Sequence, residues 1–90
     1  MKKRNEEINR KTEAFVCVNT EMGDEEETLS FLQGLPGVDE AKLVYGVWDI
    51  VAKVSAPNRD ELTKLITEDI RGNNSIRSTL TMMVVSLPDI

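Results

Sequence analysis

The stretch WDIVAKVSA, at positions 48–56, alternates apolar and polar residues. Successive side chains of a β-strand point to opposite faces, so this period of two predicts a strand with one buried face. The predicted buried face carries Trp48, Ile50, Ala52 and Val54. Val51 departs from the pattern because it is apolar on the otherwise polar side.

Three other segments are predicted to be strands. Residues 13–20, EAFVCVNT, are rich in β-branched and aromatic residues. Residues 38–46, VDEAKLVYG, are expected to join the alternating stretch through a tight turn around Gly46, since glycine tolerates positive φ. Residues 75–87, SIRSTLTMMVVSL, form the last predicted strand.

Two segments carry helix signals. The first is expected to begin at Asp24, where Glu27 completes a capping-box pattern, and to end before Pro36. The second is expected to begin at Asn58, with Glu61 three positions later, and to end at Gly72. Its apolar stripe consists of Leu62, Leu65, Ile66 and Ile70.

The resulting order is βαββαβ, with a faint internal repeat between QGLPGVDEAKLV and RGNNSIRSTLTM. This order predicts an α+β fold, the ferredoxin-like sandwich of a four-stranded antiparallel sheet with both helices on one face. The other face would be left uncovered. Apolar residues expected on that face are Val51, Met83, Val85 and Leu87. We therefore expect a homodimer that associates through the sheet face and can build higher oligomers.

Composition excludes several kinds of chemistry. The 90 residues include one cysteine and no histidine, which argues against an internal disulfide, a Cys/His zinc cluster and a histidine base. Cys17 has no neighbouring base or cation in the sequence and is expected to be a small buried apolar group. We expect neither a metal nor another cofactor.

Charge is distributed unevenly along the chain. Residues 1–11 carry a net charge of +3 and residues 12–90 a net charge of −8. We interpret residues 1–12 as a charged tail and residues 13–90 as one folded domain. An acidic domain repels phosphate backbones, so no direct nucleic-acid binding is expected. No apolar segment approaches the roughly 20 residues that span a bilayer, and the N-terminus does not resemble a signal peptide, so we expect no membrane contact and a cytoplasmic location.

A family resemblance rests on a Gly-x-aromatic-Asp turn at Gly46, Trp48 and Asp49, a Thr-x-Thr segment at Thr79 and Thr81, and the link GLPGV at 34–38. With the strands and helices between them, these motifs resemble the effector-binding domain, or RAM domain, of the Lrp/AsnC regulators over residues 13–87. The resemblance implies a dimer of the α+β barrel type, an amino acid or similar effector bound between subunits, and a role in transcription regulation.

Full-length members of that family carry a helix-turn-helix DNA-binding domain before the effector domain. Only a dozen residues precede Glu13. We therefore expect a stand-alone effector domain, whose partners would be a small-molecule ligand, copies of itself and full-length Lrp/AsnC regulators.

The ligand site is predicted around the Gly46 turn and the start of the last strand. The backbone amide near Gly46 could approach a ligand, and Asp49 could pair with an ammonium group. Hydroxyls and the aromatic ring complete the predicted set of Gly46, Trp48, Asp49, Ser78, Thr79 and Thr81. Each has a simpler structural explanation: a turn glycine, a core or interface tryptophan, a hairpin-capping carboxylate and strand-forming threonines.

The sequence leaves three other functions open. The chain could be an assembly partner that alters oligomers of full-length regulators without a ligand, or an amino-acid sensor of the ACT type that pairs sheets edge to edge. An enzyme related to the small dimeric α+β-barrel monooxygenases would need an acid-base or redox group, for which the sequence offers only carboxylates and Cys17. We therefore do not expect an enzyme.

Overall fold

The computed structural model describes residues 11–86, in which strands and helices follow the expected βαββαβ order. The strands are β1 (Thr12–Thr20), β2 (Val38–Leu43), β3 (Ile50–Ala56) and β4 (Ile76–Met83). The helices are α2 (Glu25–Gln33) and α3 (Arg59–Lys64), the latter continuing directly into a π-helical segment, η1 (Leu65–Ile70). Residues 1–10 of the expected tail, and Leu87 of the expected last strand, lie outside the described residues.

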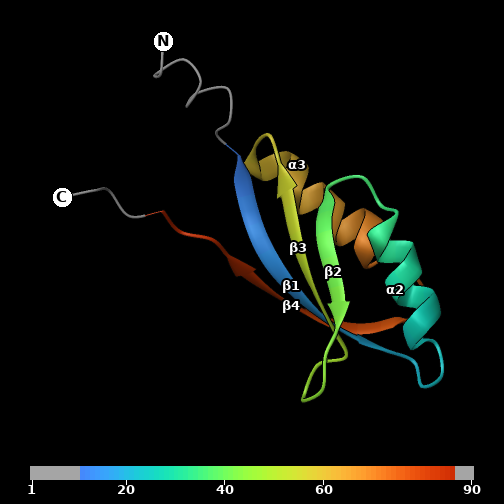
Figure 1. Cartoon of the computed structure of the whole chain (residues 1–90). Coiled ribbons are helices and arrows are strands. Elements are labelled where there is room, and N and C mark those ends of the chain that lie inside the picture. Colours follow the sequence, from blue (N-terminus) through green and yellow to red (C-terminus); the bar gives the residue numbers. More distant parts are fainter. Residues whose placement is uncertain (1–10, 87–90) are drawn as a thin grey trace, which may run out of the picture.

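The four strands form one antiparallel sheet in the order β2-β3-β1-β4. Figure 1 shows α2 and α3 side by side on the same face of this sheet, while the opposite face carries no helix within residues 11–86. The ferredoxin-like fold predicted from the sequence is confirmed.

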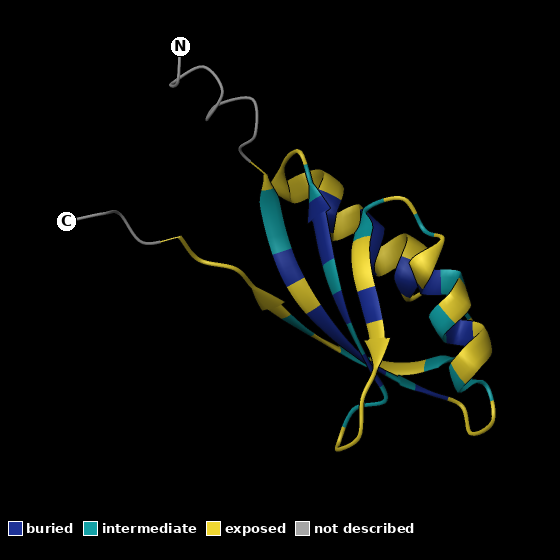
Figure 2. Cartoon of the chain, viewed as in Figure 1, coloured by how far each residue is buried: buried dark blue, intermediate teal, exposed yellow. Residues whose placement is uncertain are grey.

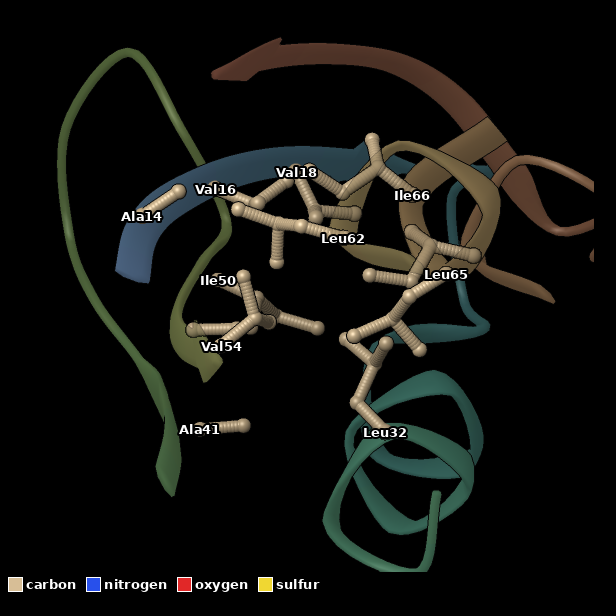
Figure 3. Packing of buried hydrophobic residues seen from close by; sticks show 12 residues of the cluster. Ala14, Val16, Val18, Leu32, Ala41, Ile50, Val54, Leu62, Leu65 and Ile66 are labelled. Atoms are coloured by element: carbon tan, nitrogen blue, oxygen red, sulfur yellow. The ribbon is translucent and has the colours of Figure 1, made fainter. Parts of the chain in front are cut away.

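The core lies between that sheet face and the two helices (Figure 3). Ile50, Ala52 and Val54 are fully buried, which confirms the alternation predicted in this segment. The helices contribute Leu32, Leu62, Leu65, Ile66 and Ile70, so the predicted apolar stripe of the second helix is also confirmed. Trp48, expected to begin this face, lies before the start of β3 and is half-buried.

The two helices begin in different ways. Asn58 caps α3 as expected, because its side-chain oxygen accepts a hydrogen bond of 2.9 Å from the Glu61 amide. The capping box expected at Asp24 is wrong. The Asp24 carboxylate does not cap α2 and instead accepts a hydrogen bond of 2.8 Å from the Ser75 hydroxyl. It thereby ties the start of α2 to the turn before β4, a contact across 51 positions of sequence.

The connection between β2 and β3 is longer than the expected tight turn. Leu43 lies opposite Ile50, and the Val44 amide donates to the Asp49 carbonyl at 2.9 Å. Four residues then remain to reverse the chain, too many for a two-residue turn. The positive φ expected at Gly46 is confirmed at +140°, and the loop exposes the whole side chain of Tyr45 to solvent.

The β4 residues that lie on the uncovered face are not the ones expected. Met83 lies opposite Ala14, a fully buried residue of the core, so Met83 points to the helix side of the sheet. The prediction for Met83 is therefore wrong. In β4, apolar residues occur at both odd-numbered and even-numbered positions. Only the register of β4 with β1 therefore decides which of them face outward.

Cross-strand pairing defines the actual open face. Cys17 lies opposite both Val51 and Leu80, and Phe15 lies opposite Met82. We call the set Phe15, Cys17, Val51, Leu80 and Met82 the open-face cluster. Its centre, Cys17, is only 6% exposed, whereas Phe15, Leu80 and Met82 are each between 39% and 46% exposed. Figure 2 shows the resulting bands of buried and exposed residues along the strands.

Candidate functional site

Several chain segments meet at one end of the sheet: the end of β1, the loop between β2 and β3, the start of α2 and the start of β4 (Figure 1). A pocket of about 390 Å³ lies among them. It is lined by Asn19, Thr20, Met22, Glu25, Asp49, Arg77 and Ser78. We call this cavity the Asp49 pocket.

Asp49 is held in place by hydrogen bonds to β1. Its carboxylate oxygen Oδ2 accepts a bond of 2.9 Å from the Thr20 amide. Its own amide donates to the Val18 carbonyl at 3.0 Å and to the Asn19 side-chain oxygen at 3.1 Å. Within residues 11–86 the other carboxylate oxygen has no hydrogen-bond partner, so it is available to a cationic group in the pocket.

The start of β4 supplies a cation and a hydroxyl to the same pocket. Arg77 places its Nε 4.0 Å from the Glu21 carboxylate, and both side chains are largely exposed, so this pair is weak. Ser78 lies opposite Asn19 in the sheet. The pocket therefore combines the carboxylates of Asp49 and Glu25 with the guanidinium of Arg77, a set that can receive both ends of a zwitterion.

The other predicted site residues lie at varying distances from this pocket. Gly46 lines a neighbouring pocket of about 410 Å³ that also includes Asp49. Thr79 shares a third pocket, of about 350 Å³, with Ser78. Thr81 lies opposite Val16, further along β4, and neither Thr81 nor Trp48 lines any of these three pockets.

The sheet separates the hydroxyls that the sequence pattern grouped together. Thr79 lies opposite Val18 and Thr81 opposite Val16, and both of these β1 residues belong to the buried core on the helix side. Ser78 lies opposite Asn19 and points the other way. The structure thus brings Asp49 together with Ser78, and Asp49 together with Gly46, but not all of the predicted residues into one cavity.

Sequence reasoning missed four polar residues of the Asp49 pocket: Asn19, Thr20, Glu25 and Arg77. Arg77 carried a usable signal, because it immediately precedes the hydroxyl residues Ser78 and Thr79. The contribution of Glu25 depends on how α2 packs at the end of the sheet, which no local pattern reveals.

Metal-binding and membrane-spanning features are both absent between residues 11 and 86. No group of three or more His, Cys, Asp or Glu side chains there could hold a metal ion. None of the helices in that range has the length and apolarity to cross a membrane.

Comparison with known proteins adds a family match. Residues 13–89 match the family described as the Lrp/AsnC ligand binding domain. An uncharacterised HTH-type transcriptional regulator of Pyrococcus furiosus is 33% identical over 79 residues, which cover 84% of this chain and 53% of that protein. The chain therefore spans about half the length of the curated relatives it matches.

Solved structures show the same fold. A hypothetical protein from Pyrococcus horikoshii is 36% identical with a TM-score of 0.79, and the match covers 84% of this chain and 92% of that one. A transcriptional regulator from Neisseria meningitidis, solved as a complex with L-Met, has a TM-score of 0.75 over 83% of this chain and 50% of that one. Its identity is 13%, so this likeness is one of fold alone.

Proposed function

The chain belongs to the Lrp/AsnC ligand-binding domain family, and on that premise we propose that it binds an amino-acid effector in the Asp49 pocket and serves transcription regulation. The observation that carries the proposal is the presence of a carboxylate, Asp49, and a guanidinium, Arg77, on the wall of one pocket.

The chemistry of the pocket matches an amino acid better than an apolar or singly charged ligand. An α-ammonium group would pair with the unpartnered oxygen of Asp49, and an α-carboxylate would accept from Arg77 and the Ser78 hydroxyl. The L-Met complex of the Neisseria meningitidis regulator supports this ligand class, since that protein shares the fold. Gly46, Trp48, Thr79 and Thr81 remain proposed contacts that would need groups from a second subunit to complete them.

We further propose that the domain works as an oligomer built through the open-face cluster. A depression of about 350 Å³ lies on this face, lined by Phe15, Glu40, Lys42, Val44, Val51 and Lys53. Its apolar floor and charged rim of both signs suit association with an identical surface. Full-length Lrp/AsnC regulators are the proposed heterologous partners.

Two negative proposals accompany this function. The 90-residue chain does not bind DNA by itself, because residues 12–90 carry a net charge of −8. Retardation of DNA by the chain in a salt-sensitive manner would contradict this.

The domain is also not catalytic, since it has no histidine and its Cys17 is buried within β1. We also propose that the domain acts in the cytoplasm, as a component of transcription regulation.

Calorimetric titration with each of the standard L-amino acids tests the central proposal. We expect saturable binding of at least one of them at a stoichiometry of one ligand per chain or per subunit pair. Asp49→Asn should weaken that binding about tenfold or more, because a charge-assisted hydrogen bond is lost. Asp39→Asn is the matched control: Asp39 is an exposed carboxylate of β2 outside the pocket, and its replacement should leave affinity unchanged.

An assembly partner without a ligand is the second candidate function. The exposed apolar side chains of the open-face cluster favour it, because they call for a protein partner whether or not an effector binds. No heat of binding with any amino acid, combined with stable co-assembly with a full-length regulator, would select this candidate over the sensor.

A further inference from the structure

A pocket lies at the junction of η1 and β4, on the outer edge of the sheet. It has a volume of about 350 Å³ and is lined by Arg71, Ile76, Arg77, Ser78 and Thr79. It shares Arg77 and Ser78 with the Asp49 pocket, whereas Arg71, Ile76 and Thr79 line only this one of the two. We call it the Arg71 pocket.

Arg71 is positioned by both its backbone and its side chain. Its amide donates to the Ile66 carbonyl at 3.0 Å, which closes the end of η1. Its Nε donates to the Thr79 hydroxyl oxygen at 3.0 Å, which directs the side chain toward β4. This bond uses only one of the five N–H donors of the guanidinium group, and the others remain for a ligand.

Neither arginine of the pocket is neutralised by a close acid within residues 11–86. Arg71 forms no ion pair there, and the nearest carboxylate contact of Arg77 is the exposed one at 4.0 Å to Glu21. No acidic side chain from that part of the chain lines the pocket. By contrast, Asp49 and Glu25 both line the neighbouring Asp49 pocket.

This concentration of positive charge is unusual for the domain. Residues 12–90 carry a net charge of −8, and only six of them are lysine or arginine. Two of those six line the same small cavity. Guanidinium groups present rigid forks of donors that match the oxygens of phosphate and carboxylate groups.

We propose that the Arg71 pocket binds an oxyanion with two negative charges, either a phosphate group or a dicarboxylate. Arg71 and Arg77 supply the positive charge and the N–H donors from which the anion would accept hydrogen bonds. Thr79 is a positioning residue in this proposal, because its hydroxyl oxygen holds Arg71 and does not need to contact the anion. The site shares Arg77 and Ser78 with the Asp49 pocket, and Arg71 and Thr79 distinguish it from the amino-acid site.

NMR titration of the ¹⁵N-labelled chain tests the proposal, with inorganic phosphate and succinate as separate probes at equal, low ionic strength. Low salt is needed because both arginines are exposed and screening weakens their attraction for anions. We expect saturable shifts of the amides of residues 76–79 with at least one probe. The probe that binds more tightly identifies the chemical class.

The matched variants are Arg71→Gln and Arg59→Gln, since Arg59 is an exposed arginine at the start of α3, outside the pocket. Arg71→Gln should weaken binding of the tighter probe about fivefold, while Arg59→Gln leaves it unchanged. Amino-acid binding in the Asp49 pocket should persist in Arg71→Gln, which separates the two sites. If Arg71→Gln does not fold, Arg77→Gln must show the same loss of anion affinity.

Non-saturating shifts, shifts spread over other surfaces, or equal affinities of Arg71→Gln and the unaltered chain would each overturn the proposal.

Discussion

Asp49 occupies a position where structural and ligand-binding demands meet. One carboxylate oxygen accepts the amide of Thr20, a residue only 4% exposed, while the carboxylate also lines the Asp49 pocket. If the carboxylate is structural, loss of its hydrogen-bond acceptor should lower stability. If it binds a ligand, loss of its charge should lower affinity. Two substitutions at the same position can therefore separate the roles.

Asp49→Ala is expected to lower the free energy of unfolding by about 1 to 3 kcal/mol, because the Thr20 amide would lose its partner in a nearly buried position. Asp49→Asn keeps an oxygen that can accept the same bond, so its unfolding free energy should stay close to that of the unaltered chain. Urea denaturation of both variants measures the difference. Equal stability of Asp49→Ala and Asp49→Asn would show that the Thr20 bond contributes little.

At the scale of elements, the packing of η1 against the link before β2 depends on Gly37. Its φ is +99°, and a Cβ atom there would lie 2.7 Å from Cδ2 of Leu65, a buried residue of η1. Glycine at this position therefore satisfies two demands at once: a left-handed backbone and close approach of a helix.

Gly37→Ala should destabilise the fold by about 2 to 4 kcal/mol, since both backbone strain and a clash with Leu65 are introduced. Gly23→Ala is the matched control. Gly23 has a similar φ of +93°, but a Cβ atom there would meet no neighbouring atom within 4 Å, so only the backbone cost of about 1 to 2 kcal/mol should appear. Thermal melting of the two variants isolates the packing contribution. An equal loss of stability in both would show that close packing against Leu65 adds nothing to the cost.

At the scale of the whole molecule, the open-face cluster leaves an apolar surface without a cover from residues 11–86. Phe15, Leu80 and Met82 are exposed on the face opposite both helices. Such a surface on a small acidic domain favours self-association over a monomer.

Light scattering at micromolar concentration should therefore give at least a dimer. Leu80→Lys should raise the dissociation constant more than about tenfold, because it would bury an unpaired ammonium group in the interface. Leu43→Lys is the control: Leu43 is also 46% exposed, but it lies opposite Ile50 on the helix side of the sheet. A monomeric unaltered chain, or equal effects of the two substitutions, would contradict association through this face.

Local patterns in the sequence determined the order of elements and most of the core. The alternation at Ile50, Ala52 and Val54, and the stripe from Leu62 to Ile70, depend on side-chain periodicity within one element, which any short window reveals. The cap at Asn58 was equally predictable, because it joins residues three positions apart. The positive φ of Gly46 was predictable because glycine tolerates it and the chain must reverse between two predicted strands.

Only the tertiary structure decided how the elements meet. Residues far apart in the chain meet in the pairing of Met83 with Ala14, in the bond from Ser75 to Asp24, and on the wall of the pocket that Arg77 and Asp49 share. Such contacts depend on strand register and helix packing. A register shift of one residue moves every side chain of a strand to the opposite face, and β4 has apolar residues at both odd and even positions. The faces of β4, and with them the division between the Asp49 and Arg71 pockets, were therefore set by pairing with β1.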